Sequence, residues 1–337
     1  MNLDYEKFTS EFLEALKDIM PDAELERVSV EKVNGTKDAV RICLPEHKNV
    51  IPTAYLDDLY KAHQAGIPPK DIAGKLSQSI LIDSRKIPDK VHFDMEESSD
   101  KLFPCVINKE ANQKLLSDMP HKDIEGTDLA LIARFKIDET PEYAATFMVT
   151  NQISAAFRMK PEDVLEQAVS NGSQEKYICR GISEVLADEM KKNGAPKEML
   201  EELCSRKNDL CYILSNERMV QGAAVLGYKD KIRKSLKTLG EEKCYILPSS
   251  IHEVLLIPGS MAGQSSPEEL SDMVRAVNGT EVLPEEQLSN HVYFFDGNNL
   301  SIADSQTPDK KTIRAPGIGK NPSGNTKKHE KTKAPTR

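Results

Sequence analysis

The sequence predicts an α+β fold in which antiparallel β-hairpins and short sheets are interleaved with amphipathic helices. Pairs of alternating apolar segments separated by turn residues predict the hairpins. Other segments repeat apolar residues every three or four positions, which is typical of helices with one buried face. Strands and helices do not alternate regularly along the chain, as a doubly wound parallel sheet requires. The 337 residues are enough to bury a core.

The first region, residues 1–82, predicts a helix, a hairpin and two further helices. The turn sequence Asn34-Gly35 separates two segments of alternating apolar residues, which is a strong local signal for a two-residue hairpin. These segments are 25–33 and 39–44. Apolar residues at helical spacing predict helices over 4–19, over 55–65 and from Pro69 onward.

A charged, irregular segment at 83–101 predicts a linker, and the second region, 102–303, predicts an α+β domain. In that domain we expect strands at 104–107, 128–137, 144–149, 210–215, 243–247, 252–257, 291–296 and 300–303. We expect helices at 111–116, 152–157, 161–169, 180–192 and 267–277, with a further helix ending at Leu239. The sequence Ser266-Pro267-Glu268-Glu269 predicts a capping box. We prefer it to a phosphate-binding loop because two carboxylates at a helix start repel an anion.

The last segment, 304–337, predicts a disordered basic tail because it is rich in polar residues and nearly without aliphatic ones. From residue 305 onward it carries nine Lys or Arg and two acidic residues, so the preceding residues hold a net charge of −16 within the total of −9. An acidic body is a poor electrostatic match for nucleic acid. We therefore expect at most weak, non-specific nucleic-acid contact, and only through the tail.

Nothing in the sequence indicates a membrane or secreted location. The first residues lack the features of a signal peptide, and no apolar run approaches the ~20 residues that span a bilayer. The six cysteines form no C-x-x-C pair, so zinc ribbons and thioredoxin-type motifs are absent. Cys204 and Cys211 are the pair whose proximity we would test first. We expect a cytoplasmic protein with reduced thiols.

The segment 248–253 contains the candidate catalytic residues Ser250, His252 and Glu253. A hydrolase would use Ser250 as the nucleophile and His252 as the base. No G-x-S-x-G or H-E-x-x-H motif accompanies them. The competing interpretation is structural: the serines form a turn, and His252 starts the next strand with a satisfied hydrogen bond. We prefer the structural interpretation.

Strand geometry supports that preference. If the segment is extended, Ser250 and His252 share one face and Glu253 points to the other face, where it cannot orient the imidazole. The carboxylate of a catalytic triad would then have to come from elsewhere, for example from Asp272 or Asp296.

Two other histidines, His121 and His291, are candidates for a metal site because carboxylates are abundant around them. No spacing of these residues requires a metal, and a histidine beside a strand is usually structural. No motif indicates a cofactor. We therefore assign neither a metal nor a cofactor.

Six segments carry a resemblance to a known family. They are Ala54-Tyr55-Leu56-Asp57-Asp58-Leu59-Tyr60, Ile107-Asn108-Lys109-Glu110-Ala111-Asn112, Met119-Pro120-His121, Thr127-Asp128-Leu129-Ala130, Leu247-Pro248-Ser249-Ser250-Ile251-His252-Glu253 and 281–293 (EVLPEEQLSNHVY). They resemble an uncharacterised bacterial family, found mainly in gut Firmicutes and catalogued as domain of unknown function 5688. The resemblance implies an α+β domain. It implies no activity, because none is established for that family.

Two hypotheses about function follow. The preferred one is a non-enzymatic interaction or regulatory protein whose partner is another protein. The alternative is a hydrolase-like enzyme that uses the Ser250/His252 region. An enzyme requires a deep pocket in which His252 meets a carboxylate and a nucleophile. An interaction protein requires an apolar patch or an exposed sheet edge.

Overall fold

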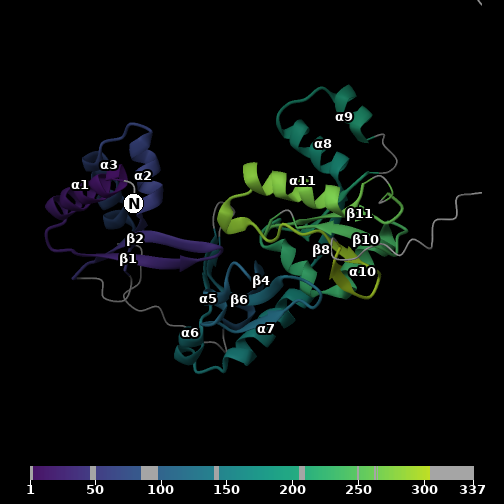
Figure 1. The fold of residues 1–337 in the computed structure, drawn as a ribbon, viewed down its shortest axis with the longest axis horizontal. Helices are drawn as coiled ribbons and strands as arrows, with labels where there is room; N and C mark the ends of the chain where they lie inside the picture. The colour runs from purple at the N-terminus through teal and green to yellow at the C-terminus, as the bar shows by residue number, and fades with distance from the viewer. Residues whose placement is uncertain are drawn as a thin grey trace, which may run out of the picture. The chain divides into compact units, whose positions relative to one another are not determined.

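The computed structural model describes residues 3–45, 51–84, 98–139, 144–204, 209–248, 250–261, 263 and 265–303. It confirms the α+β class: helices are interleaved with antiparallel strands, and the described strands form three sheets (Figure 1). The predicted tail, 304–337, and residues 85–97 of the predicted linker lie outside the described residues. In the described part of the chain, every helix is too short or too polar to span a lipid bilayer.

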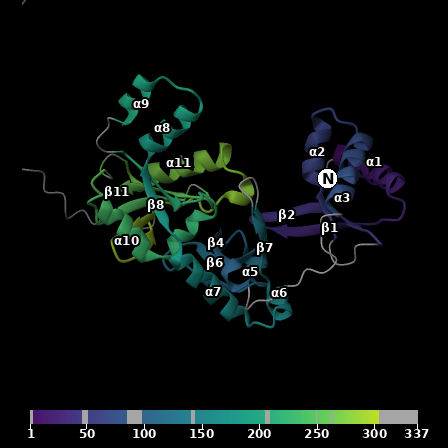
Figure 2. The same ribbon diagram turned by 180° about the vertical axis from the view of Figure 1, so that it is seen from behind.

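The N-terminal region contains the predicted hairpin and helices. Its elements are α1 (Leu3–Ile19), β1 (Glu24–Lys32), β2 (Gly35–Cys43), β3 (Thr53–Tyr55), α2 (Leu56–Gln64) and α3 (Pro69–Ser84). Asn34 has a φ of +63° in the tight turn between β1 and β2, a left-handed conformation that Asn tolerates. Figure 2 shows the three helices beside the hairpin. Phe8 and Phe12 of α1, Leu56 of α2 and Ile72 of α3 form one core with Ile42 of the sheet.

The middle of the chain forms a four-stranded sheet with a helix on one face. Its elements are β4 (Leu102–Asn108), α5 (Gln113–Leu116), β5 (His121–Asp123), β6 (Leu129–Glu139), β7 (Ala144–Met148), α6 (Asn151–Ala156) and α7 (Pro161–Gln174), preceded by the 3-10 turn η1 (Ser99–Lys101). The strand order is β4-β6-β5, and β7 pairs with β6. α7 packs on one face through Val164 and Ala168. The opposite face carries Cys105, Ile107 and Ile132.

The C-terminal part forms a six-stranded sheet in the order β13-β12-β10-β11-β9-β8. Its strands are β8 (Tyr177–Gly181), β9 (Tyr212–Asn216), β10 (Cys244–Leu247), β11 (Val254–Pro258), β12 (Tyr293–Phe295) and β13 (Leu300–Ile302). Its helices are α8 (Ile182–Lys192), α9 (Lys197–Cys204), η2 (Gly222–Gly227), α10 (Lys229–Thr238), α11 (Pro267–Thr280) and η4 (Pro284–Glu286).

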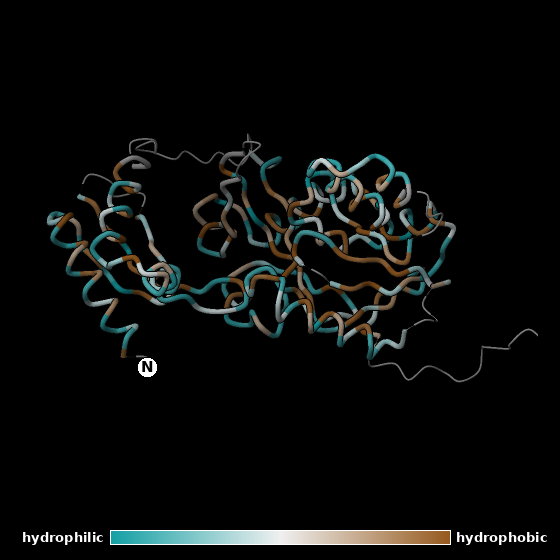
Figure 3. The backbone as a smooth tube through the Cα atoms, turned by 90° about the horizontal axis from the view of Figure 1, so that it is seen from above, coloured by the Kyte–Doolittle hydropathy of each residue, from teal (hydrophilic) through white to brown (hydrophobic). Residues whose placement is uncertain are grey.

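Both faces of this sheet are buried, which explains the continuous apolar run of β11. η2 and α10 cover one face, where Val225 and Ile232 pack beside Leu256. α11 covers the other face through Leu270 and Val274. Figure 3 shows the hydrophobic segments, in brown, running through the interior.

The predicted capping box is present at the start of α11. The Ser266 hydroxyl accepts from the backbone N–H of Glu269, and the Glu269 carboxylate accepts from the backbone N–H of Ser266. The sequence missed the eight-residue helix α9. It also missed the strands β3, β5 and β8. Each has three to five residues, too few for a period of two to stand out from its neighbours.

Candidate functional site

The segment 250–253 forms a turn between β10 and β11, so the expectation of an extended backbone is wrong. Ser250 Oγ donates to Glu253 Oε1 at 3.1 Å and accepts from the backbone N–H of His252 at 3.0 Å. The backbone N–H of Ser250 donates to the Glu253 carbonyl at 3.3 Å. The argument that Glu253 faces away from Ser250 fails for the same reason, because a turn brings residues three positions apart together. Ser250 is buried, and its hydroxyl closes the turn.

The imidazole of His252 is held on both sides. Nδ1 lies 3.4 Å from the backbone N of Gln221, which donates to it, and Nε2 lies 3.3 Å from Glu286 Oε1. These partners assign the tautomer in which Nε2 carries the proton. The carboxylate that meets His252 therefore comes from Glu286 of η4, and not from Asp272 or Asp296.

The turn is also the point where β9, η2 and η4 meet. The carbonyl of His252 accepts from Ser215 Oγ at 2.7 Å and from the backbone N–H of Gly222 at 3.0 Å. The backbone N–H of Ile251 donates to the Glu286 carbonyl at 3.0 Å. Gly222 permits this close approach, because a Cβ there would lie 2.1 Å from Ser215 Oγ.

A cavity of about 810 Å³ opens beside the His252 ring; we refer to it as the His252 cavity. Its floor is the face of the four-stranded sheet that α7 leaves uncovered. Residues from β1, β2, β4, β6, β7, η4 and the 250–253 turn line it. Its wall includes Cys105, Arg134, Gln221, His252 and Glu286.

The β1–β2 hairpin, whose strands contribute to this cavity, is anchored by its turn to Asn112 and to the η4 segment. The backbone N–H of Asn34 donates to Asn112 Oδ1 at 2.7 Å, and Asn112 Nδ2 donates back to Asn34 Oδ1 at 2.7 Å. Asn34 Nδ2 also donates to the carbonyls of Pro284 and Gln287, each at 2.7 Å. The same asparagine therefore makes the hairpin turn and anchors it.

The Cys105 thiol is a neutral donor in this cavity. It donates to Gln221 Oε1, and only 2% of Cys105 is exposed. Burial raises the pKa of the Cys105 thiol from its ordinary value of 9.0 to about 11, although the nearby Arg134 guanidinium acts in the opposite direction. At neutral pH the thiol is therefore protonated, whereas a nucleophilic cysteine requires a thiolate.

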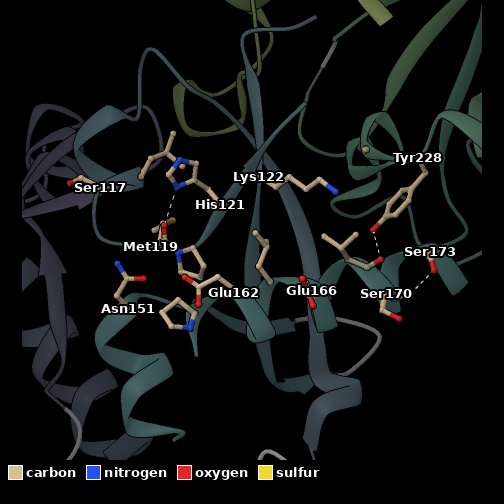
Figure 4. Close-up of a pocket in the computed structure, with 16 residues that line it drawn as sticks. Ser117, Met119, His121, Lys122, Asn151, Glu162, Glu166, Ser170, Ser173 and Tyr228 are labelled. Atoms are coloured by element: carbon tan, nitrogen blue, oxygen red, sulfur yellow. Dashed lines mark hydrogen bonds between the residues drawn. The ribbon is translucent and has the colours of Figure 1, made fainter. Parts of the chain in front are cut away.

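The candidate metal ligand His121 lies at a different cavity, of about 1000 Å³ (Figure 4). Its Nδ1 lies 3.1 Å from the Met119 carbonyl, and the ring is on the opposite side of this cavity from Glu162 and Glu166 of α7. Among the described residues, no three His, Cys, Asp or Glu side chains come close enough together to hold a metal ion.

His291, the other candidate, lines a smaller cavity of about 390 Å³ next to a hydrogen-bonded carboxylate. Its backbone N–H donates to Ser289 Oγ at 3.0 Å. Asp128 accepts from Ser289 Oγ at 2.8 Å, from Asn108 Nδ2 at 2.8 Å and from Tyr293 Oη at 2.6 Å. This network joins the four-stranded sheet to β12, and donors rather than a cation satisfy the Asp128 carboxylate.

Sequence reasoning selected His252 but missed the other polar residues of its cavity. Cys105, Arg134, Gln221 and Glu286 come from four separate elements, and none belongs to a local motif. A pattern could have indicated Arg134, since it is a cation that directly follows the apolar run 129–133 within the same strand.

The fold and the site describe an α+β protein with a polar cavity. The chain belongs to a family of unknown function, DUF5688, whose model matches residues 5–297. No curated protein and no solved structure matches the chain. Five of the six segments that carry the resemblance, 54–60, 107–112, 119–121, 247–253 and 281–293, contribute residues to the wall of the His252 cavity.

Proposed function

We propose that this chain is a non-enzymatic interaction protein that binds a segment of a partner protein in the His252 cavity. The composition of the cavity wall carries the proposal: it combines partly exposed apolar side chains with charged ones. The apolar residues are Val33, Leu115, Met148 and Ile251. An apolar centre with a polar rim is the usual anatomy of a protein interface.

The hydrogen bonds in the cavity favour binding over catalysis. The Cys105 thiol is protonated at neutral pH and donates to Gln221. Both ring nitrogens of His252 are engaged, and Ser250 closes its own turn with its hydroxyl. A hydrolase requires a nucleophile held against a base. Among the contacts described for these residues, none joins a nucleophile to the imidazole, so the hydrolase alternative gains no support.

The proposal includes a location in the bacterial cytoplasm. The resemblance to a family found mainly in Firmicutes favours a bacterial source. The described cysteines Cys43, Cys105, Cys179, Cys211 and Cys244 carry free thiols, which is typical of a reducing compartment.

Quantitative mass spectrometry of proteins retained by the immobilised full chain tests the proposal. The wild type is compared with Asp118→Lys and Asp22→Lys in a lysate of the native host. Asp118 is exposed on the wall of the His252 cavity, whereas Asp22 is exposed in the turn after α1 and does not line the cavity. Both variants make the same change of charge.

We expect the wild type and Asp22→Lys to retain the same partner, and Asp118→Lys to lose it. Equal retention by all three proteins would show that binding does not involve the cavity. Retention of no partner above the level on an uncoated support would contradict the interaction hypothesis itself.

A further inference from the structure

Arg134 is a partly buried cation in the His252 cavity that pairs with no carboxylate of the described residues. Its Nε and Nη2 atoms donate to Thr146 Oγ1 at 3.2 and 2.7 Å. Within the described part of the chain, no Asp or Glu lies within ion-pair distance of its guanidinium. A guanidinium has five N–H donors, so three of them remain for another acceptor.

The other cations of the cavity are already engaged. Lys37 pairs with Glu285 at 3.4 Å and with Asp58 at 3.6 Å. Lys32 Nζ lies over the Tyr55 ring, 4.7 Å from its centroid. Arg134 differs because, among the described residues, its hydrogen-bond partner is a neutral hydroxyl. Removing a cation from water is unfavourable unless an anion compensates for it.

A second donor lies on the same part of the cavity wall. In the β4–β6 register Cys105 is opposite Ile132, so Arg134, two residues further along β6, is its diagonal neighbour on the same face. Gln221 accepts from the Cys105 thiol through Oε1, and its side-chain NH₂ makes no hydrogen bond within the described residues. The Cys105 thiol therefore lies between the Arg134 guanidinium and the Gln221 amide, which both have N–H groups without a described acceptor.

From this juxtaposition we propose that Arg134 and Gln221 form a subsite for a single carboxylate of the partner segment. The inference rests on the proposed function and names the chemistry that the partner must present. A guanidinium donates two parallel hydrogen bonds to a carboxylate, and the Gln221 amide supplies one more. The apolar residues of the floor accept a neighbouring apolar side chain of the same segment.

The charges of the rim favour a carboxylate over a phosphate. Glu31, Asp118, Glu285 and Glu286 also line the cavity. These carboxylates repel a dianion more strongly than a monoanion. One unpaired guanidinium matches one negative charge. The carboxylate has two possible sources in a protein: an Asp or Glu side chain, or the C-terminus.

Three tripeptides with a capped N-terminus act as probes, and each consists of alanine, leucine and a third residue. The first ends in glutamate amide, so its carboxylate is a side chain. The second ends in glutamine with a free C-terminus, so its carboxylate is terminal, and the third ends in glutamine amide and has no carboxylate. The Nε–Hε signal of Arg134 is followed by ¹⁵N NMR in the full-length protein at peptide concentrations up to about 10 mM, which covers millimolar dissociation constants. Arg134→Gln identifies the signal.

We expect a saturable shift of the Arg134 signal with the first or the second peptide, and the responding peptide identifies the source of the carboxylate. The neutral peptide should bind at least ~10-fold more weakly. Because Arg134→Gln lacks the Arg134 signal, binding to the variants is followed by a leucine- or isoleucine-methyl signal of the cavity floor. Arg134→Gln should bind the responding peptide ~10-fold more weakly than the wild type. Lys234→Gln, which changes an exposed position on α10, should bind it as tightly as the wild type.

Equal affinity for the neutral peptide, or no saturable shift with either acidic peptide, would overturn the subsite. A larger response to inorganic phosphate than to the acidic peptides would overturn the choice of carboxylate. If Asp118→Lys releases the cellular partner while Arg134→Gln retains it fully, the subsite fails and the proposed function stands.

Discussion

The two ends of the His252 cavity differ in how completely their polar groups are satisfied. At the 250–253 turn, the Ser250 hydroxyl, the His252 ring and the His252 carbonyl all have partners within the chain. At the β6 end, Arg134 bonds only to a hydroxyl and the Gln221 amide NH₂ has no described partner. Satisfied groups contribute to folding, whereas unsatisfied donors that face a cavity are available to a ligand. Substitutions at the turn should therefore lower stability, and substitutions at the β6 end should lower binding.

Among the substitutions, Gly222→Ala should lower the free energy of unfolding most. The new Cβ would lie 2.1 Å from Ser215 Oγ and 2.7 Å from the His252 carbonyl oxygen, so the turn must move away from β9. Overpacking of this kind lowers the free energy of unfolding by ~1–3 kcal/mol, and we expect the upper end of that range. Urea denaturation followed by circular dichroism measures the change.

Gly74→Ala is the matched control for Gly222→Ala. Gly74 lies inside α3, and a Cβ there would meet no atom within 4 Å. Alanine is a better helix former than glycine, so the free energy of unfolding of this variant should rise by ~0.5–1 kcal/mol. A similar loss of stability in Gly222→Ala and Gly74→Ala would show that the conformation of the 250–253 turn does not depend on the close approach at Gly222.

Ser250→Ala should have the next largest effect. The substitution removes the hydroxyl that bonds the Glu253 carboxylate and leaves the backbone N–H of His252 without its partner, at a position only 6% exposed. Leaving such groups unsatisfied lowers the free energy of unfolding by ~1–3 kcal/mol. The free energy of unfolding of His252→Ala should fall by about 1 kcal/mol, because the hydrogen bonds of the imidazole are longer and partly exposed to solvent. Chemical denaturation compares the two variants with the wild type.

A fluorophosphonate probe separates this structural role from catalysis. We expect no labelling of the wild type. Labelling at Ser250 that disappears in His252→Ala, with both variants as stable as the wild type, would reject the structural interpretation and restore the hydrolase hypothesis.

A smaller effect concerns the Cys105 thiol at alkaline pH. Because its pKa is about 11 in the folded protein and ordinarily 9.0, the unfolded chain ionises first. The stability associated with Cys105 is therefore fully present below pH 9 and is lost as the pH rises towards 11. Iodoacetamide modification of Cys105, followed by peptide mapping, should be slow at pH 8 and should accelerate above pH 9. Rapid modification at pH 7 would reveal a reactive thiolate and would weaken the case against catalysis.

The sequence predicted the elements whose signals are local. The Asn34 turn, the Ser266 capping box and most strands of the six-stranded sheet are confirmed because a few neighbouring residues determine them. The cavity could not be predicted in the same way. Glu286 reaches His252 across 34 positions, and Gln221 meets Cys105 across 116. Such pairs depend on how the sheets pack, which no spacing within one segment encodes.

The reasoning about 250–253 failed for a related reason. The continuous apolar run 254–257 predicted a strand, which was extended back to His252, but β11 begins at Val254. The hydroxyl of Ser250 competes for the backbone N–H of His252 and turns the chain there.

The most direct test of the contrast between the two ends of the cavity is the free energy of unfolding of Arg134→Gln and Ser250→Ala, measured side by side in urea. The account predicts a loss of ~1–3 kcal/mol for Ser250→Ala and a change within ~0.5 kcal/mol for Arg134→Gln, because glutamine still reaches a hydroxyl and no ion pair is broken. A loss for Arg134→Gln that equals or exceeds the loss for Ser250→Ala would mean that Arg134 serves the fold, and would contradict its assignment to a binding site.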